Sequence, residues 1–247
     1  MIHRPALALP TAIPANAMVI AVNRITIATR RMVRQGRGYT SAREPRGVAQ
    51  LVEHRSPKPG VAGSSPVAPV SPGVEIRRAE VERDSQLIRR IDTSFETATI
   101  FEVQRAARGF RLVEQAAAPP VVKRFPLDDL SSTTHEWEQS WLALDREQPV
   151  GVVATQHDGW NKRVVVWHLY VDAGYRRRGI GRCLLETALD AGREAGMRTA
   201  WLETSNLNVP GVRAYERLGF ELCGLDTSLY VGTAAEGEVS LFLCRGL

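Results

Sequence analysis

The sequence predicts a mixed α/β fold in which a sheet of six or seven strands carries helices on both faces. Three observations predict it. Short apolar segments, several with the alternation of strands, recur from residue 74 onward. The segment 177–195 places its apolar residues on one helical stripe. The order in which the expected strands and helices follow one another is typical of a mixed sheet covered on both sides.

The first elements have local signals. Residues 74–79 alternate like a strand, and residues 81–92 place Leu87, Ile88 and Ile91 on one helical face. A pair of strands at 98–105 and 109–115 is joined by Ala107-Arg108-Gly109, which predicts a hairpin.

Three consecutive strands come next. They are separated by Glu147-Gln148 and by the polar turn at 158–161, and the expected ranges are 139–145, 149–157 and 163–171. The helix 177–195 follows them, with Ile180, Leu184, Ala188, Ala191 and Ala195 on its apolar stripe. The remaining expected elements are a strand at 199–204, a helix at 209–218, and strands at 220–231 and 238–244.

Residues 1–73 differ in composition from the rest of the chain. Nine of the 14 prolines lie within residues 1–72, together with ten basic and two acidic residues. The string GVAQLVEHRSPKPGVAGSSPVAP at 47–69 resembles the conceptual translation of a tRNA gene. We therefore expect residues 1–73 to be a disordered or spurious N-terminal extension and residues 74–247 to form the folded domain.

Charge and cysteine content exclude several classes of partner. The chain beyond residue 72 holds 22 basic and 25 acidic residues, so nucleic acid is not expected to bind and cations are. Residues 5–22 are apolar but contain three prolines, so neither a membrane span nor a secretion signal is expected. Cys183, Cys223 and Cys244 lie far apart, without a C-x-x-C pair, which predicts no metal site and a cytoplasmic protein.

A run of arginine and glycine follows the strand at 163–171. The first N–H groups of a helix have no partner within it and attract anions. Glycine lets a phosphate approach the backbone closely, and arginine adds positive charge. The spacing lacks the Lys-Ser/Thr of a P-loop, so nucleotide hydrolysis is not expected. The run therefore predicts a pyrophosphate site made by Arg176, Arg177, Arg178, Gly179, Ile180, Gly181 and Arg182.

A second motif lies about one strand further on. Asn208 precedes Tyr215 by seven residues, and Gly219-Phe220 follows. Together, R-x-x-G-x-G and N-x₆-Y-x₃-G-F resemble the GNAT superfamily over roughly residues 74–247. The resemblance implies a GNAT fold and acetyl-CoA as co-substrate.

The resemblance also implies roles for single residues. Asn208 would contact the arm of the co-substrate, and Tyr215 would face the thioester sulfur. The N–H groups around residues 177–182 would hold the pyrophosphate. The strand backbone that would pair with the pantetheine arm belongs to Leu169, Tyr170 and Val171.

Longer strings resemble the streptothricin acetyltransferases within this superfamily. They are SFET at 94–97, IFEV at 100–103, WNK at 160–162, LETSNLN at 202–208 and GFELCGLDTSLY at 219–230. These enzymes acetylate an amine on an antibiotic, so the resemblance implies a small cationic acceptor and a part in antibiotic resistance. Where the group tends to have an acidic pair before the loop, this chain has Trp167 and His168.

Acetyl transfer to an amine predicts an acid and a base. An amine of ordinary pKa, about 10.4, must lose a proton before it attacks. Glu203 and His168 are the candidate bases; the alternatives are a carboxylate that binds the substrate cation and a half-buried strand histidine. The Tyr215 hydroxyl is the candidate acid for the leaving thiolate, or else an aromatic ring that only packs. A backbone N–H within 169–171 would meet the oxyanion.

Two other functions stay open from the sequence. One is a GNAT enzyme that acetylates a protein amine, and the other is an acyl-CoA-binding protein without activity. Both motifs are intact and Tyr215 is present, which favours an enzyme. The acceptor and the oligomeric state, with a homodimer as one option, are not determined by the sequence.

Overall fold

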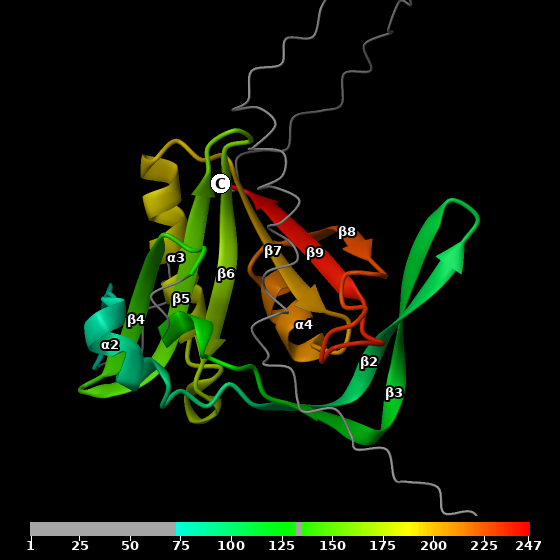
Figure 1. The fold of residues 1–247 in the computed structure, drawn as a ribbon, viewed down its shortest axis with the longest axis horizontal. Coiled ribbons are helices and arrows are strands. Elements are labelled where there is room, and N and C mark those ends of the chain that lie inside the picture. The colour runs from blue at the N-terminus through cyan, green and yellow to red at the C-terminus, as the bar shows by residue number, and fades with distance from the viewer. Residues whose placement is uncertain (1–72, 132–134) are drawn as a thin grey trace, which may run out of the picture.

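Seven strands form one mixed sheet in the order β1-β4-β5-β6-β7-β9-β8 (Figure 1). The computed structural model describes residues 73–131 and 135–247, so the expectations for residues 1–72 lie outside the described residues. Only β6 and β7 pair in parallel among these strands. The strands of the sheet are β1 (Val74–Arg78), β4 (Gln139–Asp145), β5 (Gln148–Asp158), β6 (Arg163–Val171), β7 (Thr199–Ser205), β8 (Glu221–Asp226) and β9 (Ser240–Gly246). The predicted mixed sheet with helices is confirmed.

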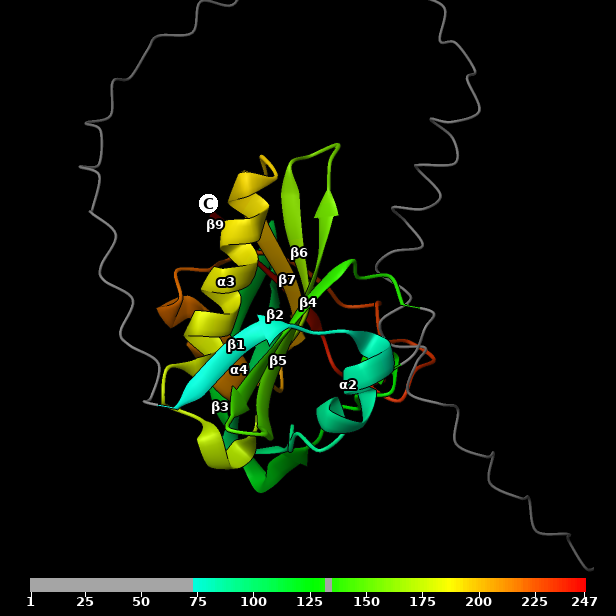
Figure 2. The same cartoon turned by 90° about the vertical axis from the view of Figure 1, so that its left-hand side faces the viewer.

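Helices cover the sheet on both faces, because its central strands are apolar on both sides. On β4, Trp141 and Ala143 enter one core while Leu142 and Leu144 enter the other. The first core also takes side chains from α3 (Ile180–Glu194) and α4 (Val209–Arg217). The second core lies under α2 (Val81–Ile88) and the short 3₁₀ helix η1 (Asp129–Ser131). Figure 2 shows α3 and α2 on opposite sides of the strands.

The longest helix, α3, packs tightly onto the sheet. Its apolar stripe is fully buried at Leu184, Leu185 and Ala188. Near its end, a side-chain carbon added at Gly192 would come within 2.3 Å of Val164 on β6. Glycine at 192 therefore lets the helix backbone rest directly on the strand that carries the candidate site, and this contact fixes the direction of α3.

The predicted hairpin is longer than expected and forms a sheet of its own, β2 (Phe95–Ala106) paired with β3 (Gly109–Lys123). Strand β3 continues through Pro119 and Pro120 because a two-stranded sheet has only edge strands, where proline is tolerated. Asn206, which is 7% exposed, fastens this hairpin to the main sheet. The Asn206 carbonyl accepts from Phe101 N–H, and Asn206 Nδ2 donates to the Phe101 carbonyl. Its Oδ1 also accepts from Val239 N–H.

Outside the hairpin, three predicted boundaries were wrong by three residues or more. Helix α2 ends at Ile88, not 92, and the following residues form turns. Helix α3 begins at Ile180, not 177, because Arg177 and Gly179 adopt left-handed backbone conformations. Strand β8 ends at Asp226, not 231, because the Asp226 carboxylate accepts hydrogen bonds from Ser228 N–H and Oγ, both at 2.7 Å, and so closes a turn.

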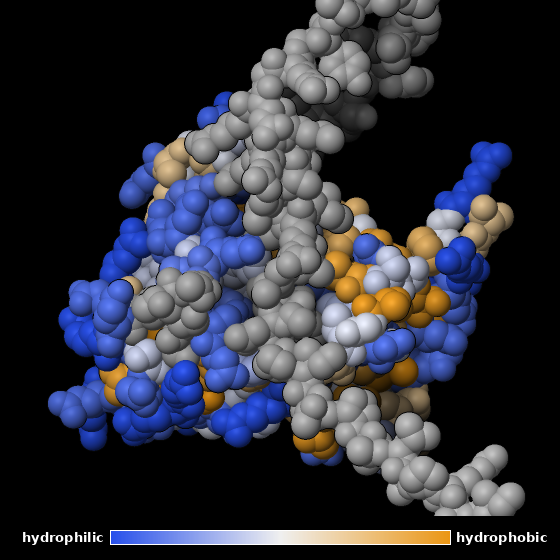
Figure 3. All heavy atoms as spheres, in the orientation of Figure 1, coloured by the Kyte–Doolittle hydropathy of each residue, from blue (hydrophilic) through white to orange (hydrophobic). Residues whose placement is uncertain are grey.

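Polar and apolar surfaces separate on the face seen in Figure 3. Hydrophilic residues cover the side of α2 and β4, and apolar residues gather beside the hairpin and over β8. Leu222 of β8 is 48% exposed and Val231 is 68% exposed. Among the described residues, no helix is both long and apolar enough to cross a membrane.

Candidate active site

The two parallel strands β6 and β7 separate part-way along their length. Their pairing runs from Arg163 opposite Thr199 to Val166 opposite Leu202 and then stops. Beyond that point β6 keeps its pairing with β5 as far as Val171, and β7 keeps its pairing with β9 as far as Ser205. Residues 167–171 therefore have an edge that faces no strand, where an extended molecule can hydrogen-bond to the backbone. The predicted positions Leu169, Tyr170 and Val171 lie on it.

A bulge on β6 changes which side chains face each core. His168 pairs with Ala154 and Val166 with Thr155, so Trp167 has no partner on β5. After the bulge, Leu169 and Val171 pack on the side of α3. His168 and Tyr170 point to the other face, toward the region of η1. After the bulge, the unpaired backbone edge of β6 therefore lies next to α3. The polar side chains of His168 and Tyr170 point to the opposite face of the sheet.

The loop after β6 has the features of an anion site. Arg177 adopts a left-handed conformation with φ 64°, which is uncommon for a residue with a side chain, and Gly179 has φ 82°. Helix α3 then begins at Ile180, with its first N–H groups unpaired within the helix. A Cβ at Gly181 would lie 3.3 Å from Val171 Cγ2. The glycines thus keep the helix start bare beside the free edge of β6, which suits a pyrophosphate continuous with an extended arm.

The arginines of this loop are not equivalent. Arg176 Nε donates to the Val171 carbonyl at 3.1 Å, and Arg178 donates to the Gly174 carbonyl at 3.2 Å while lying over the ring of Tyr175. Both guanidiniums therefore hold the loop in shape. Arg177 and Arg182 are exposed and contribute charge next to the helix start.

Asn208 has a structural use as well as its predicted one. It is the N-cap of α4, where its Oδ1 accepts from Gly211 N–H at 3.1 Å and its Nδ2 donates to Thr204 Oγ1 at 3.0 Å. A Cβ at Gly211 would overlap this side chain, so the glycine lets the cap close. Asn208 therefore fixes α4, and with it Tyr215, next to the end of β7.

Tyr215 and Glu203 come together where β6 and β7 separate. Tyr215 packs its ring edge-on against Phe220, with centroids 6.0 Å apart. Burial, with the nearby charge of Glu203, raises the pKa of Tyr215 to about 12. Burial also raises the pKa of Glu203, although the hydrogen bond from the Tyr230 hydroxyl acts to lower that pKa. Tyr215 is therefore protonated throughout the working pH range and can act as a proton donor.

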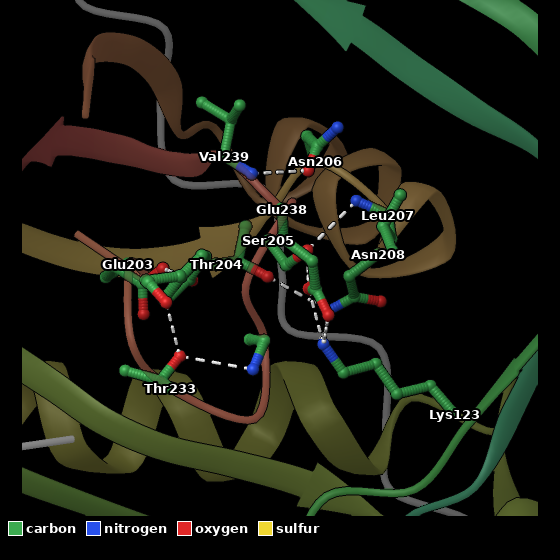
Figure 4. Close-up of polar contacts among 12 residues, drawn as sticks. Lys123, Glu203, Thr204, Ser205, Asn206, Leu207, Asn208, Thr233, Glu238 and Val239 are labelled. Atoms are coloured by element: carbon green, nitrogen blue, oxygen red, sulfur yellow. Dashed lines mark hydrogen bonds and ion pairs between the residues drawn. The ribbon is translucent and has the colours of Figure 1, made fainter. Parts of the chain in front are cut away.

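A second carboxylate lies beside Glu203. Figure 4 shows Glu238, just before β9, pointing toward Ser205 and Lys123. Lys123 Nζ donates to Glu238 Oε1 at 2.6 Å, and Ser205 Oγ donates to the same carboxylate. The ammonium also lies 5.7 Å from the centre of the Phe125 ring. The chain thus holds a cation of its own against a buried carboxylate and an aromatic face, next to Glu203.

His168 is placed differently from Glu203. It is 3% exposed, and its Nε2 lies 2.6 Å from Asp129 Oδ2 in η1. Burial would raise the pKa of Asp129, but the adjacent imidazole of His168 outweighs burial and leaves that pKa lowered. Asp129 precedes His168 by 39 residues and belongs to a three-residue turn, so no local pattern in the sequence connects the two.

The structure thus brings most predicted residues to one region. Tyr215, Glu203 and Tyr170 are close enough for their charges to shift one another's pKa values. Sequence reasoning missed several polar residues of this region because they come from distant segments with no shared motif. These residues are Lys123, Asp129, Tyr230 and Glu238.

The comparisons with known proteins agree with this geometry. The family model "Acetyltransferase (GNAT) family" matches residues 107–220. A streptothricin acetyltransferase of Streptomyces lavendulae is 40% identical over 167 residues, which are 65% of this chain and 88% of that protein. The crystal structure of nourseothricin acetyltransferase has a TM-score of 0.64 and 36% identity, and covers 70% of this chain and 98% of its own.

A further solved structure shares the fold. It is a putative streptothricin acetyltransferase from Bacillus anthracis in complex with acetyl coenzyme A, with a TM-score of 0.59 and 24% identity over 70% of this chain and 99% of its own. The chain belongs to the GNAT family of acetyltransferases. It is an N-acetyltransferase, and its predicted GNAT fold is confirmed.

Proposed function

We propose that this enzyme moves the acetyl group of acetyl-CoA to an amine on a small cationic molecule of the streptothricin type. The observation that carries the proposal is the half-buried carboxylate of Glu203, which accepts a hydrogen bond from Tyr230 and acts on the pKa of Tyr215, one residue beyond the point where β6 and β7 separate. A half-buried carboxylate favours a cationic group next to it. The names of the related acetyltransferases, which act on streptothricin and nourseothricin, support the same class of acceptor.

Acetyl-CoA would lie along the free edge of β6. The backbone of Leu169, Tyr170 and Val171 would pair with the pantetheine arm, and one N–H of this stretch would meet the oxyanion. The pyrophosphate would bind at the bare helix start, at Gly179, Ile180 and Gly181, with Arg177 and Arg182 supplying charge. Arg176 and Arg178 would shape the loop. Asn208 would act by capping α4 near the arm of the co-substrate.

The acceptor would approach from the face that carries Glu203. Its ammonium would bind the Glu203 carboxylate, with Glu238 and its partner Lys123 at the side. Tyr215 would then give its proton to the thiolate that leaves. The competing acceptor is a protein amine; the related acetyltransferases named for streptothricin and nourseothricin favour the small amine. A cytoplasmic location is proposed as well, since Cys183, Cys223 and Cys244 form no disulfide bond, as is usual in a reducing compartment.

Replacing Glu203 by glutamine tests how the acceptor is recognised. We expect Glu203→Gln to raise the KM for a cationic amine on the order of tenfold, because a charge-assisted hydrogen bond is lost. The KM for acetyl-CoA should stay the same. Glutamine has nearly the same shape and still accepts from Tyr230, so the fold should persist. Steady-state kinetics with each substrate varied in turn would measure both constants.

Glu236→Gln provides the matched control. Glu236 is exposed and lies in the same segment as Tyr230 and Glu238. Glu236→Gln therefore changes the net charge of the protein by the same amount as Glu203→Gln. Its acceptor KM should match that of the wild type. An unaltered acceptor KM in Glu203→Gln, or an equal rise in both variants, would mean that Glu203 does not bind the ammonium.

A further inference from the structure

Three polar side chains form a line across one face of β6. The Tyr170 hydroxyl lies 3.4 Å from Nδ1 of His168, and Nε2 of His168 lies 2.6 Å from Oδ2 of Asp129. Each ring nitrogen of His168 thus faces a different proton-carrying group. When Nε2, on the side of the Asp129 carboxylate, carries the proton, Nδ1 is left as an acceptor for the Tyr170 hydroxyl.

The middle of this line is more buried than its Asp129 end. His168 is 3% exposed, while the side chain of Asp129 is 23% exposed. The stack of Phe95, Phe125 and Tyr170, with centroids 5.8 and 5.6 Å apart, fixes the Tyr170 ring from one side. Tyr170 is half-buried on the edge of β6 that faces no strand, so the line runs from that edge through the buried His168 to Asp129, a carboxylate that solvent partly reaches.

Tyr170 lies on the stretch of β6 that no longer pairs with β7, which is the candidate active site. Burial raises the pKa of Tyr170 well above its usual value, and the charges of Asp129 on η1, Tyr215 on α4 and Glu203 on β7 act on it in the same direction. Tyr170 therefore stays protonated, and its oxygen can accept a proton only while it passes its own proton onward. The imidazole of His168, with Nδ1 at 3.4 Å, is the group placed to receive it.

We propose that Tyr170, His168 and Asp129 form a relay that carries the proton of the acceptor ammonium to solvent; this rests on the proposed function. The N–H bond of the ammonium breaks, its proton joins the Tyr170 oxygen, and the Tyr170 proton passes to Nδ1 of His168. Asp129 stabilises the imidazolium. After the products leave, Nδ1 returns a proton to the Tyr170 oxygen as the Tyr170 hydroxyl proton passes to water in the emptied site, which restores the Nε2–H tautomer for the next turnover.

The rest of the reaction balances around this step. The neutral amine forms a C–N bond to the acetyl carbonyl carbon, and the C–S bond breaks. Tyr215 gives its proton to the sulfur and regains one from the nitrogen as the amide forms. One proton per turnover leaves the enzyme, and it is the proton that the relay carries. Tyr170 touches the acceptor, while His168 and Asp129 act through it as positioning residues.

Asp129→Asn tests the relay, because asparagine keeps the shape but cannot stabilise an imidazolium. At pH 7 we expect kcat to fall on the order of 10²-fold, with the KM for acetyl-CoA unchanged. The deficit should shrink as the pH is raised to about 9.5, because the neutral fraction of an amine with a pKa of about 10.4 rises by roughly two to three orders of magnitude over that range. An acceptor that is already neutral needs no relay.

Asp128→Asn is the matched control. Asp128 is the neighbouring residue, its side chain is 61% exposed, and its carboxylate lies 3.8 Å from Arg89 on the surface. This variant should keep wild-type kinetics at both pH values. Tyr170→Phe retains the ring of the aromatic stack and should show the same pH-dependent loss of kcat as Asp129→Asn. If one of the two variants fails to fold, the other still tests the relay.

Two results would overturn the relay. One is wild-type kcat at pH 7 in either relay variant; the other is a deficit of the same size at pH 7 and 9.5, which is what a purely structural role of His168 and Asp129 produces. Wild-type turnover of acetyl-CoA with the amine is measured in the same assay. The proposed function therefore stands or fails on the wild-type rate, independently of the variants.

Discussion

A Tyr215→Phe variant should lose on the order of 10²-fold or more in kcat while its KM for acetyl-CoA hardly changes. In the proposed mechanism the hydroxyl acts only when the thiolate leaves, so its contribution would belong to the transition state and not to the binding of substrates. The structure supports this role because burial and the charge of Glu203 raise the pKa of Tyr215 to about 12, which keeps the donor protonated.

The stability of this variant should stay close to that of the wild type. Phenylalanine keeps the ring and its edge-on contact with Phe220, so packing around α4 is preserved. Thermal unfolding of both proteins would check this. A wild-type kcat in the variant, measured with saturating acceptor and with chemistry shown to limit the rate, would refute the acid role of Tyr215 and leave the fold assignment intact.

Gly181→Glu should abolish the binding of CoA. A carboxylate at the start of α3 would occupy the place where the pyrophosphate approaches the backbone and would repel its charge. The fold should survive, because a Cβ at 181 meets only Val171 Cγ2, at 3.3 Å, and an acidic residue in the first turn is favourable for the helix. Calorimetric titration with CoA measures the loss.

Gly181→Gln separates size from charge. Glutamine has nearly the volume of glutamate without its charge, so it should weaken the binding of CoA less than glutamate does. A folded Gly181→Glu protein that binds CoA with wild-type affinity would show that the pyrophosphate does not lie at the start of α3.

The fold could be predicted where local pattern and tertiary structure agree. The expected strands at 139–145 and 163–171 coincide with β4 and β6, since both are apolar runs bounded by polar turns. The prediction from local pattern failed where the hydrogen bonds of one side chain ended a strand early. Leu229-Tyr230-Val231 looks like the end of a strand, but the Asp226 turn stops β8, and Tyr230 turns inward to Glu203 instead. The turn is local, but the inward position of Tyr230 depends on Glu203, which lies 27 residues earlier in the sequence.

The candidate site could be predicted only in part, for the same reason. Tyr215 and the loop at 176–182 stand in motifs that one segment of chain carries, so they are readable from the sequence. Asp129 lies in a 3₁₀ turn and Lys123 at the end of a hairpin strand, and only the folded chain brings them to His168 and Glu238. Neither segment carries a spacing or composition that marks it as functional.

The most direct measurement of the central claim is the rate at which the wild-type protein releases CoA from acetyl-CoA with a panel of acceptors. The panel holds streptothricin, polyamines, aminoglycosides and peptides with free N-termini. We expect rapid release with streptothricin or another small cationic amine, slow release with peptides, and acetylated amine as the product by mass spectrometry. Faster turnover of peptides than of every small amine, or no release with any amine, would contradict the account.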